Sequence, residues 1–226
     1  MTTQDLQRKL GLVPDGVWGP KTNAAFVDMF VNPRAPAING HDLIAAASRL
    51  GVPVANLKAL SAKESRTSFS RAGRPVILPE PHIFSRLTGG IYDRSHPRIS
   101  SRRWNRRLYV RLMADRYQKL AQMAALDIDA ALQSASWGKF QIMGFHWQRL
   151  GYASPLQFAL AHVSSEANHL DALVRFIEAN GLQKALRDCK PNDRESCVEF
   201  ARRYNGRLFW KNQYAAKLSK LIARYS

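Results

Sequence analysis

The stretch VANLKALSAKESRTSFSRAGRPVILPEPH, residues 54–82, sets the pattern for the rest of the chain. Its first half spaces apolar residues such as Leu57 and Leu60 three or four apart, which predicts a helix that ends at Glu64. A polar segment follows, and the β-type run RPVIL then leads to a second acid, Glu80. A carboxyl group at the end of a partly buried helix has a raised pKa and can protonate a leaving oxygen. The alternative is an ordinary solvated glutamate.

The composition indicates a folded and strongly basic protein. Its 226 residues are 46% hydrophobic and 10% aromatic, which is typical of one packed core or of a main domain with a small module. The 34 basic and 17 acidic residues give a formal net charge of +17. This charge favours binding to polyanions such as nucleic acid, anionic lipid, lipopolysaccharide and acidic wall polymers, without choosing among them.

Targeting signals and metal-site patterns are both absent from the sequence. No run of about 18 apolar residues predicts a membrane span, and the start MTTQDLQRKL lacks the layout of a signal peptide. We therefore expect synthesis in a host cytoplasm, without a signal peptide, and release by another factor. Cys189 and Cys197 bracket a polar loop, and the sequence leaves open whether they pair. Two cysteines without a nearby histidine pair predict no metal site, and no cofactor is expected.

Residues 3–30 predict two short helices joined by a tight turn, with Pro14 and Gly16 as turn signals. The turn and the restart of the helix read DGVWGPKT, residues 15–22. This string resembles the D-G-x-x-G-x-x-T hallmark of the common peptidoglycan-binding module. The resemblance implies a wall-binding module at residues 1–34, followed by a linker at residues 35–41. The wall-binding residues that it implies are Asp15, Gly16, Trp18, Gly19 and Thr22.

Further helices are expected along the rest of the chain. Asp42 is expected to cap the helix that precedes residue 51, and a long helical region is expected from Ala114 to Leu132. Between Asp93 and Asp115 the chain has no acid but seven arginines, interleaved with aromatic residues. Such a tract can grip nucleic acid, or it can form the anion-facing side of a helix, which we favour. The arginines are Arg94, Arg98, Arg102, Arg103, Arg106, Arg107 and Arg111.

Two later segments also suggest function. The string SWGKFQIMG, residues 136–144, sets the indole of Trp137 near the amide of Gln141, a pair suited to a sugar face and to its hydroxyl and acetamide groups. The alternative is a helix start with a buried bend. Residues 208–225 predict an amphipathic basic helix, which can lie on an anionic membrane or close the core with its apolar face. These two uses are compatible.

Three short strings follow one another in the chain: Glu64-Ser65, SWGKFQIMG at residues 136–144 and RRYNGR at residues 202–207. Their order resembles that of the lysozyme-like superfamily. The strings GRPVILPEPHIF, LTGGIYDRSHP and ARRYNG further resemble the N-acetylmuramidase domain of modular phage endolysins. The resemblance implies a mostly α, lysozyme-like domain with a small β-hairpin at residues 42–226. Departures from the family pattern are ESRTSF after residue 63, the prolines beside Glu80 and the arginine tract.

The resemblance also implies roles for residues in the reaction. Glu64 is expected to be the general acid that helps to cleave the β-1,4 bond between N-acetylmuramic acid and N-acetylglucosamine in peptidoglycan. Glu80 is the candidate second carboxylate, acting as nucleophile, base or electrostatic partner, and Asp93 is the reserve. The residues expected to position the substrate or to hold the acid are Ser65, Trp137, Gln141, Tyr204 and Asn205.

The expected partner is therefore peptidoglycan, acted on in the periplasm by a monomer that lyses the cell. Anionic outer-membrane lipid or lipopolysaccharide is a second expected partner, through the basic terminal helix at residues 208–225. No specific nucleic acid is expected. Two alternatives stay open: a lytic transglycosylase that forms 1,6-anhydro products, and a cationic protein that disrupts membranes without catalysis.

Overall fold

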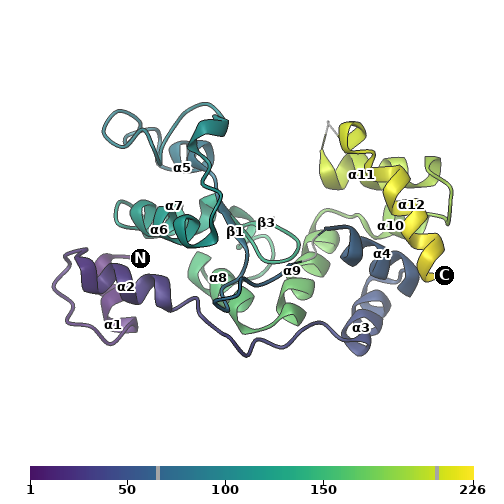
Figure 1. Cartoon of the computed structure of the whole chain (residues 1–226). Coiled ribbons are helices and arrows are strands. Elements are labelled where there is room, and N and C mark those ends of the chain that lie inside the picture. Colours follow the sequence, from purple (N-terminus) through teal and green to yellow (C-terminus); the bar gives the residue numbers. More distant parts are fainter. Residues whose placement is uncertain (65–66, 207–208) are drawn as a thin grey trace. The chain divides into compact units, whose positions relative to one another are not determined.

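The computed structural model describes residues 1–64, 67–206 and 209–226 (Figure 1). The chain divides into two compact units. The first unit comprises Met1–Ala35 and Ser68–Ser164, and the second comprises Pro36–Thr67 and Ser165–Ser226. The fold is mostly α with one small sheet, as the sequence predicts. The expected Ser65 lies outside the described residues.

Helices dominate both units. The first unit contains α1 (Thr3–Lys9), α2 (Pro20–Asp28), α5 (Pro81–Leu87), η1 (Arg106–Leu108), α6 (Met113–Ala124), α7 (Ile128–Ser134), η2 (Gly144–His146) and α8 (Pro155–Ser164). The second unit contains α3 (Gly40–Leu50), α4 (Val54–Glu64), α9 (Glu166–Ala179), α10 (Gln183–Arg187), η3 (Glu195–Cys197), α11 (Val198–Asn205), η4 (Phe209–Asn212) and α12 (Tyr214–Tyr225).

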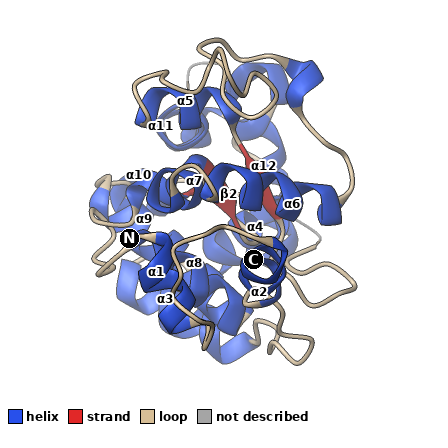
Figure 2. Cartoon of the chain, turned by 90° about the vertical axis from the view of Figure 1, so that its left-hand side faces the viewer, coloured by secondary structure: helices blue, strands red, loops and turns tan. Residues whose placement is uncertain are grey.

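The sheet lies in the first unit and has three short antiparallel strands, drawn red in Figure 2. They are β1 (Ile77–Pro79), β2 (Ala135–Trp137) and β3 (Ile142–Met143), in the order β1-β2-β3. Leu78 pairs with Ser136, and Trp137 pairs with Ile142. The segment SWGKFQIMG therefore forms the β2–β3 hairpin and is not a helix start.

Aromatic side chains build the core of the first unit around Trp137. Phe30, just after α2, lies 5.4 Å from Trp137 and 5.6 Å from Tyr117 of α6, measured between ring centroids. Trp137 is fully buried, and its indole N–H donates to the carbonyl of Leu132 at 3.0 Å. The expected stacking of Trp137 on a sugar is therefore wrong, because the core already covers both faces of the indole.

The turn between α1 and α2 is held by Gln7, which is 2% exposed. Its Nε2 donates to Asp15 at 2.7 Å and to the Thr22 hydroxyl at 3.0 Å, and its Oε1 accepts from the Gly16 backbone N–H at 2.9 Å. Gly16 has a φ of +78°, which favours glycine. Three residues of the D-G-x-x-G-x-x-T string thus maintain the turn, while Trp18 remains half-buried with an edge contact to Phe26.

In the second unit, α4 packs against α3 and α12. Asn56 of α4 is buried and donates to the carbonyls of Leu186 and Cys189, at 2.8 and 3.0 Å, so that α4 is also joined to α10. The apolar face of α12, which includes Leu218 and Ile222, is buried. This helix is therefore part of the core. Cys189 and Cys197 are buried free thiols.

Three local expectations differ from the structure. The cap of α3 is Asn39, and Asp42 completes a capping box by accepting from the Asn39 N–H at 2.9 Å. The region expected as one helix from 114 to 132 breaks into α6 and α7, because Asp127 caps α7 by accepting from the Ala130 N–H at 2.9 Å. The arginine tract is largely irregular and contains only the short turn η1.

Within the described part of the chain, no single helix is long and apolar enough to span a membrane. The helices α3 and α4 pass such a test only as a pair, with a bend of 116° at the break between them. Over the same residues, no cluster of histidine, cysteine and acidic side chains has the composition of a metal site.

Candidate active site

Glu64 is the last residue of α4 and is half-buried. The hydroxyl of Tyr214, at the start of α12, donates to Oε1 of Glu64. The neighbouring Lys63 places its ammonium 4.1 Å from the centroid of the Tyr214 ring. The carboxyl group is thus held by a tyrosine donor, whose ring also contacts the ammonium of Lys63, where α12 packs on α4.

Burial raises the pKa of Glu64, and this effect outweighs the opposing effects of the Tyr214 hydrogen bond and of the charge on Lys63. The position of Glu64 at the negative end of the α4 dipole acts in the same direction as burial. Burial and the Glu64 charge also raise the pKa of Tyr214 well above its ordinary value, so its hydroxyl remains a donor. The site therefore favours a protonated carboxylic acid.

Tyr204 extends the aromatic surface near this acid. Its ring stacks on Phe200 at a centroid distance of 5.2 Å and lies 6.0 Å from the Tyr214 ring. Burial and the charge of Glu64 raise the pKa of Tyr204. Asn205, the last residue of α11, is exposed. The two expected residues therefore lie in the same unit as Glu64.

Tyr214 was not among the site residues expected from the sequence. It stands 150 residues from Glu64, and its helical spacing predicts only a place on an apolar face. The only sequence feature that could have marked Tyr214 as a site residue is its hydroxyl, because a buried tyrosine needs a hydrogen-bond partner for its O–H group. That partner is identified only when α12 is packed on α4.

Glu80 belongs to the first unit and directly follows β1. Its side chain is 17% exposed, accepts from the hydroxyl of Tyr109, and lies 3.3 Å from Nδ1 of His82. Burial and the hydrogen bond to Glu80 raise the pKa of Tyr109, which keeps that phenol protonated. Tyr109, like Tyr214, is a site residue that the sequence did not predict.

Asp93 has a different environment. Its Oδ1 accepts from the Ser100 hydroxyl at 2.6 Å, and its Oδ2 accepts from the Ser85 hydroxyl at 3.0 Å and lies 3.6 Å from Nε of Arg102. The Ser100 hydrogen bond is the main cause that lowers the pKa of Asp93. Because protein donors occupy both carboxylate oxygens, the geometry favours a structural role for Asp93, which connects Ser85 to Ser100.

Gln141 is also occupied by the protein. Its backbone has a φ of +50°, and its Nε2 donates to the carbonyls of Gly138 and Val76, at 2.7 and 3.1 Å. Its Oε1 accepts from the Ser136 hydroxyl at 2.8 Å. These three hydrogen bonds hold the β2–β3 hairpin, so the amide has little capacity left for a sugar.

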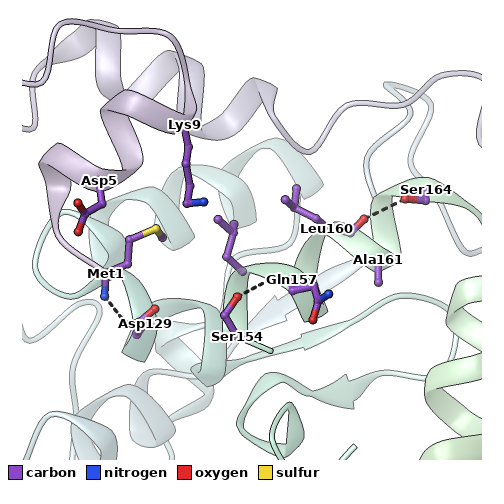
Figure 3. A pocket seen from close by; sticks show the side chains of 10 residues that line it. Met1, Asp5, Lys9, Asp129, Ser154, Gln157, Leu160, Ala161 and Ser164 are labelled. Atoms are coloured by element: carbon purple, nitrogen blue, oxygen red, sulfur yellow. Dashed lines mark hydrogen bonds and ion pairs between the residues drawn. The ribbon is translucent and has the colours of Figure 1, made fainter. Parts of the chain in front are cut away.

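A cavity of about 630 Å³ lies in the first unit beside α1 and α8 (Figure 3). Leu156 and Leu160 form part of its apolar lining, and Gln157 adds an amide. Figure 3 shows the exposed Lys9 of α1 pointing towards this cavity. The cavity thus combines apolar walls with the cation of Lys9 and the acids Asp5 and Asp129, and neither Glu64 nor Glu80 lines it.

Comparisons with known proteins show the family and the fold of this chain. The model of a family described as muramidase, N-acetylmuramidase, matches residues 53–226. The crystal structure of the Burkholderia AP3 phage endolysin is similar to the chain, with a TM-score of 0.76 and 32% sequence identity. That match covers 99% of this chain and 94% of the endolysin chain. No curated protein matches the chain.

Proposed function

The chain belongs to the N-acetylmuramidase family, and on this premise we propose that Glu64 is the general acid of a peptidoglycan hydrolase. Hydrolysis of a glycosidic bond is the activity of the family, and family membership favours it over the transglycosylase and membrane-disruption hypotheses. The observation that supports Glu64 is its raised pKa in a half-buried position with one fixed tyrosine donor. A raised pKa keeps a larger share of the carboxyl group protonated than in an exposed glutamate, which suits a general acid.

In the proposed reaction, Glu64 transfers its proton to the oxygen of the β-1,4 bond between N-acetylmuramic acid and N-acetylglucosamine. The bond between the anomeric carbon and that oxygen then breaks, and the leaving sugar departs as an alcohol. Positive charge develops on the ring that remains, and a water molecule finally adds to its anomeric carbon. The water gives one proton to a carboxylate, and Glu64 regains a proton directly or from solvent before the next turnover. The Tyr214 hydroxyl would keep Glu64 oriented and would stabilise the carboxylate that proton transfer leaves behind.

Glu64→Gln should lower the rate of lysis of purified, lipid-free walls by about 10²-fold or more, the range typical of general acids. Glutamine keeps the size of the side chain and an oxygen that accepts from Tyr214, so circular dichroism should show an intact fold. Lysis at the parental rate by this variant would contradict the assignment. Mass spectrometry of the parent's products provides an independent test, because 1,6-anhydro muropeptides would mean that the chain is a transglycosylase.

We propose Glu80 as the second carboxylate, which stabilises the positive sugar, attacks it, or takes the proton of the attacking water. Its support is a carboxyl group that is mostly shielded and oriented by Tyr109 and His82. Glu80→Gln should therefore reduce turnover on lipid-free walls more strongly than it reduces wall binding. The matched control is Asp93→Asn, which should reduce thermal stability instead, because Asp93 holds a turn. Full turnover by Glu80→Gln would exclude this role for Glu80.

Other substrate contacts are proposed for Tyr204 and Asn205, which lie in the unit of Glu64. Ser65 stays a proposal from the resemblance alone. Gln141 is proposed to act indirectly, by holding the hairpin that follows α7.

We also propose that the chain comprises a wall-binding module at residues 1–34, a linker at 35–41 and a hydrolase domain at 42–226. The half-buried Trp18 and the cavity in Figure 3 support wall binding. Lys9 and Gln157 offer a cation and an amide beside apolar walls, which suits the carboxylates, amides and methyl groups of a peptidoglycan stem peptide. These two residues were not expected from the sequence.

We propose the periplasm as the place of action, after synthesis in a host cytoplasm, because peptidoglycan lies outside the cytoplasmic membrane. The exposed lysines of α12, Lys217 and Lys220, would attract the chain to anionic lipid or lipopolysaccharide through their charge alone. The apolar face of the same helix is occupied in the core, so the helix is proposed to act without inserting.

A further inference from the structure

The arginine tract forms a basic loop, residues 91–112, which we name the arginine arm. Only η1 gives it regular structure. Its one acid, Asp93, is already bonded to two serines. All seven of its arginines are exposed: Arg94, Arg98, Arg102, Arg103, Arg106, Arg107 and Arg111. The arm therefore presents a concentrated positive charge.

The base of the arm is fastened to the helices beneath it. The Tyr92 hydroxyl donates to the carbonyl of Leu126 at 3.1 Å. The ammonium of Lys119, in α6, donates to the carbonyl of Arg98 at 3.1 Å and also to that of Leu108. These contacts hold both halves of the arm, so a partner would find its cations already placed and would lose less affinity to ordering.

Two cavities lie at this base. One, of about 450 Å³, is lined by three cations, Arg98, Arg107 and Lys119, against one acid, Asp115. Lys119 is buried there, and burial lowers the pKa of its ammonium group. The Lys119 ammonium is bonded to two neutral carbonyls, and an anion in the cavity would add the opposite charge that these carbonyls do not supply. The first cavity is therefore suited to a phosphate-sized anion.

The second cavity, of about 480 Å³, shares Arg98 and Ile99 with the first. Its lining adds apolar groups from Pro97, Ala125 and Leu126. A cationic cavity thus lies next to one with a partly apolar lining, and Arg98, Ile99 and Gln122 line both. This arrangement matches a molecule in which a phosphate group adjoins a hydrocarbon part.

The arm also exposes three large apolar side chains, Ile91 at 70%, Trp104 at 62% and Leu112 at 65%. Nucleic acid offers a stacking surface to Trp104, but it offers no comparable partner to isoleucine and leucine. At a membrane surface, tryptophan lies at head-group level, arginine lies beside phosphates, and aliphatic side chains reach the acyl boundary. An anionic membrane therefore offers a partner to the exposed tryptophan, to the arginines and to the aliphatic side chains of the arm.

From these contacts we propose that the arginine arm is a binding site for the phosphate head group and adjoining acyl region of an anionic membrane lipid. The arm thereby provides the contact with the head group and acyl region, and α12 adds only attraction by charge. Insertion of α12 would withdraw Tyr214 from Glu64, whereas the arm can bind lipid with α12 in place. Such binding goes beyond wall hydrolysis and would bring the hydrolase to a membrane surface.

Co-sedimentation of the full chain with vesicles tests the site. The vesicles contain either phosphatidylcholine alone or phosphatidylcholine mixed with phosphatidylglycerol. Arg98→Gln with Arg107→Gln should lower partition into the mixed vesicles by about tenfold or more, since each cation near an anionic surface contributes appreciably. The comparison pair, Lys217→Gln with Lys220→Gln, removes the same charge from α12 and should lower partition clearly less, because these lysines attract the chain by charge alone and line neither cavity. Equal losses for the two pairs would overturn the proposal, because net charge alone would then explain binding.

Tryptophan fluorescence tests which element enters the lipid. Trp104 and Trp210 are matched in exposure, at 62% and 60%, but Trp210 lies just before α12. With vesicles that carry brominated acyl chains, Trp104→Phe should abolish most of the quenching, and Trp210→Phe should preserve it. The reverse result would assign the membrane contact to the terminal segment and overturn the assignment to the arm.

Competitors identify the ligand class. Duplex DNA and inorganic phosphate should displace the chain from mixed vesicles only weakly, because neither fills the apolar cavity. If Arg98→Gln with Arg107→Gln weakened binding to DNA as much as binding to vesicles, the arm would be a general polyanion-binding surface. The lipid assignment would then fail. Lysis of lipid-free walls by the same variants is read separately, so that a failure of this proposal is distinguished from a failure of Glu64 as the acid.

Discussion

Glu64 combines a raised pKa with a fixed side-chain orientation. A glutamate exposed to water would have neither. Burial and the end of α4 raise its pKa, while Tyr214 holds one carboxyl oxygen and lowers that pKa. The acid must be protonated to act, so activity should fall as the pH rises through the pKa of Glu64. Because this pKa is raised, activity should persist to a higher pH than an exposed glutamate would allow.

Tyr214→Phe tests the balance between these effects. Loss of the hydroxyl removes a donor that stabilises the carboxylate, so the pKa of Glu64 should rise and the alkaline limb of the rate profile should move to higher pH. The maximal rate should fall by no more than about tenfold, as expected for one hydrogen bond of about 1 kcal/mol. Tyr225→Phe on the same helix is the control and should change neither quantity. An alkaline limb that stays in place or moves to lower pH would contradict the role of Tyr214.

Among the secondary-structure elements, α12 has a basic amphipathic sequence that is compatible both with a membrane surface and with packing in the core. Its sequence is basic and amphipathic, which suits a membrane surface, but its apolar face is packed on α4. That packing also positions Tyr214. The helix therefore acts on the candidate acid through the core, and we propose the main lipid contact for a part of the chain without regular structure.

Deletion of residues 213–226 should consequently abolish lysis of bare walls as well as of intact cells with an outer membrane. The deletion exposes the buried face of α4 and removes the donor to Glu64, so a lower melting temperature should accompany the loss. Substitution of Lys217 and Lys220 by glutamine, which keeps the helix, is the matched comparison and should preserve bare-wall lysis. If the deletion spared bare walls and affected only intact cells, α12 would be a membrane element after all.

At the scale of the whole molecule, the compact units of the structure do not coincide with the proposed functional modules. Residues 1–35 form one compact unit with residues 68–164, and Phe30 is part of the aromatic core that they share. Removing residues 1–34 would therefore destabilise the first unit. Wall binding by the N-terminal segment is better tested by a surface substitution than by a deletion.

Lys9→Gln should reduce sedimentation with purified walls by a few-fold, because it removes the cation beside the cavity and costs about 1 kcal/mol at most. Lys21→Gln is the control, since Lys21 is exposed in the same module but does not line the cavity. Both substitutions are made in the Glu64→Gln background, so that the walls are not digested. Equal sedimentation of the two variants would remove the support that the cavity gives to wall binding.

The sequence by itself determined the local features of this protein. Periodicity identified α4 and its terminal Glu64, turn residues identified the hairpin of α1 and α2, and the short strings indicated the family. These features depend on neighbouring residues, so spacing along the chain is enough to predict them. Asp42 and the break at Asp127 were misjudged because several nearby polar residues can cap a helix, and spacing does not choose among them.

Tertiary structure alone decided which side chains are covered and which partners they meet. The sequence does not distinguish a tryptophan that stacks on a sugar from one that packs in the core. Only the tertiary packing showed that Trp137 is buried in the core. Only packing brought Tyr214 to Glu64 across 150 residues and covered the apolar face of α12. Burial and long-range hydrogen bonds depend on contacts between distant segments, and those contacts set the pKa of Glu64. The sequence thus indicated Glu64 as the candidate acid, but the proton affinity of Glu64 is a property of the folded chain.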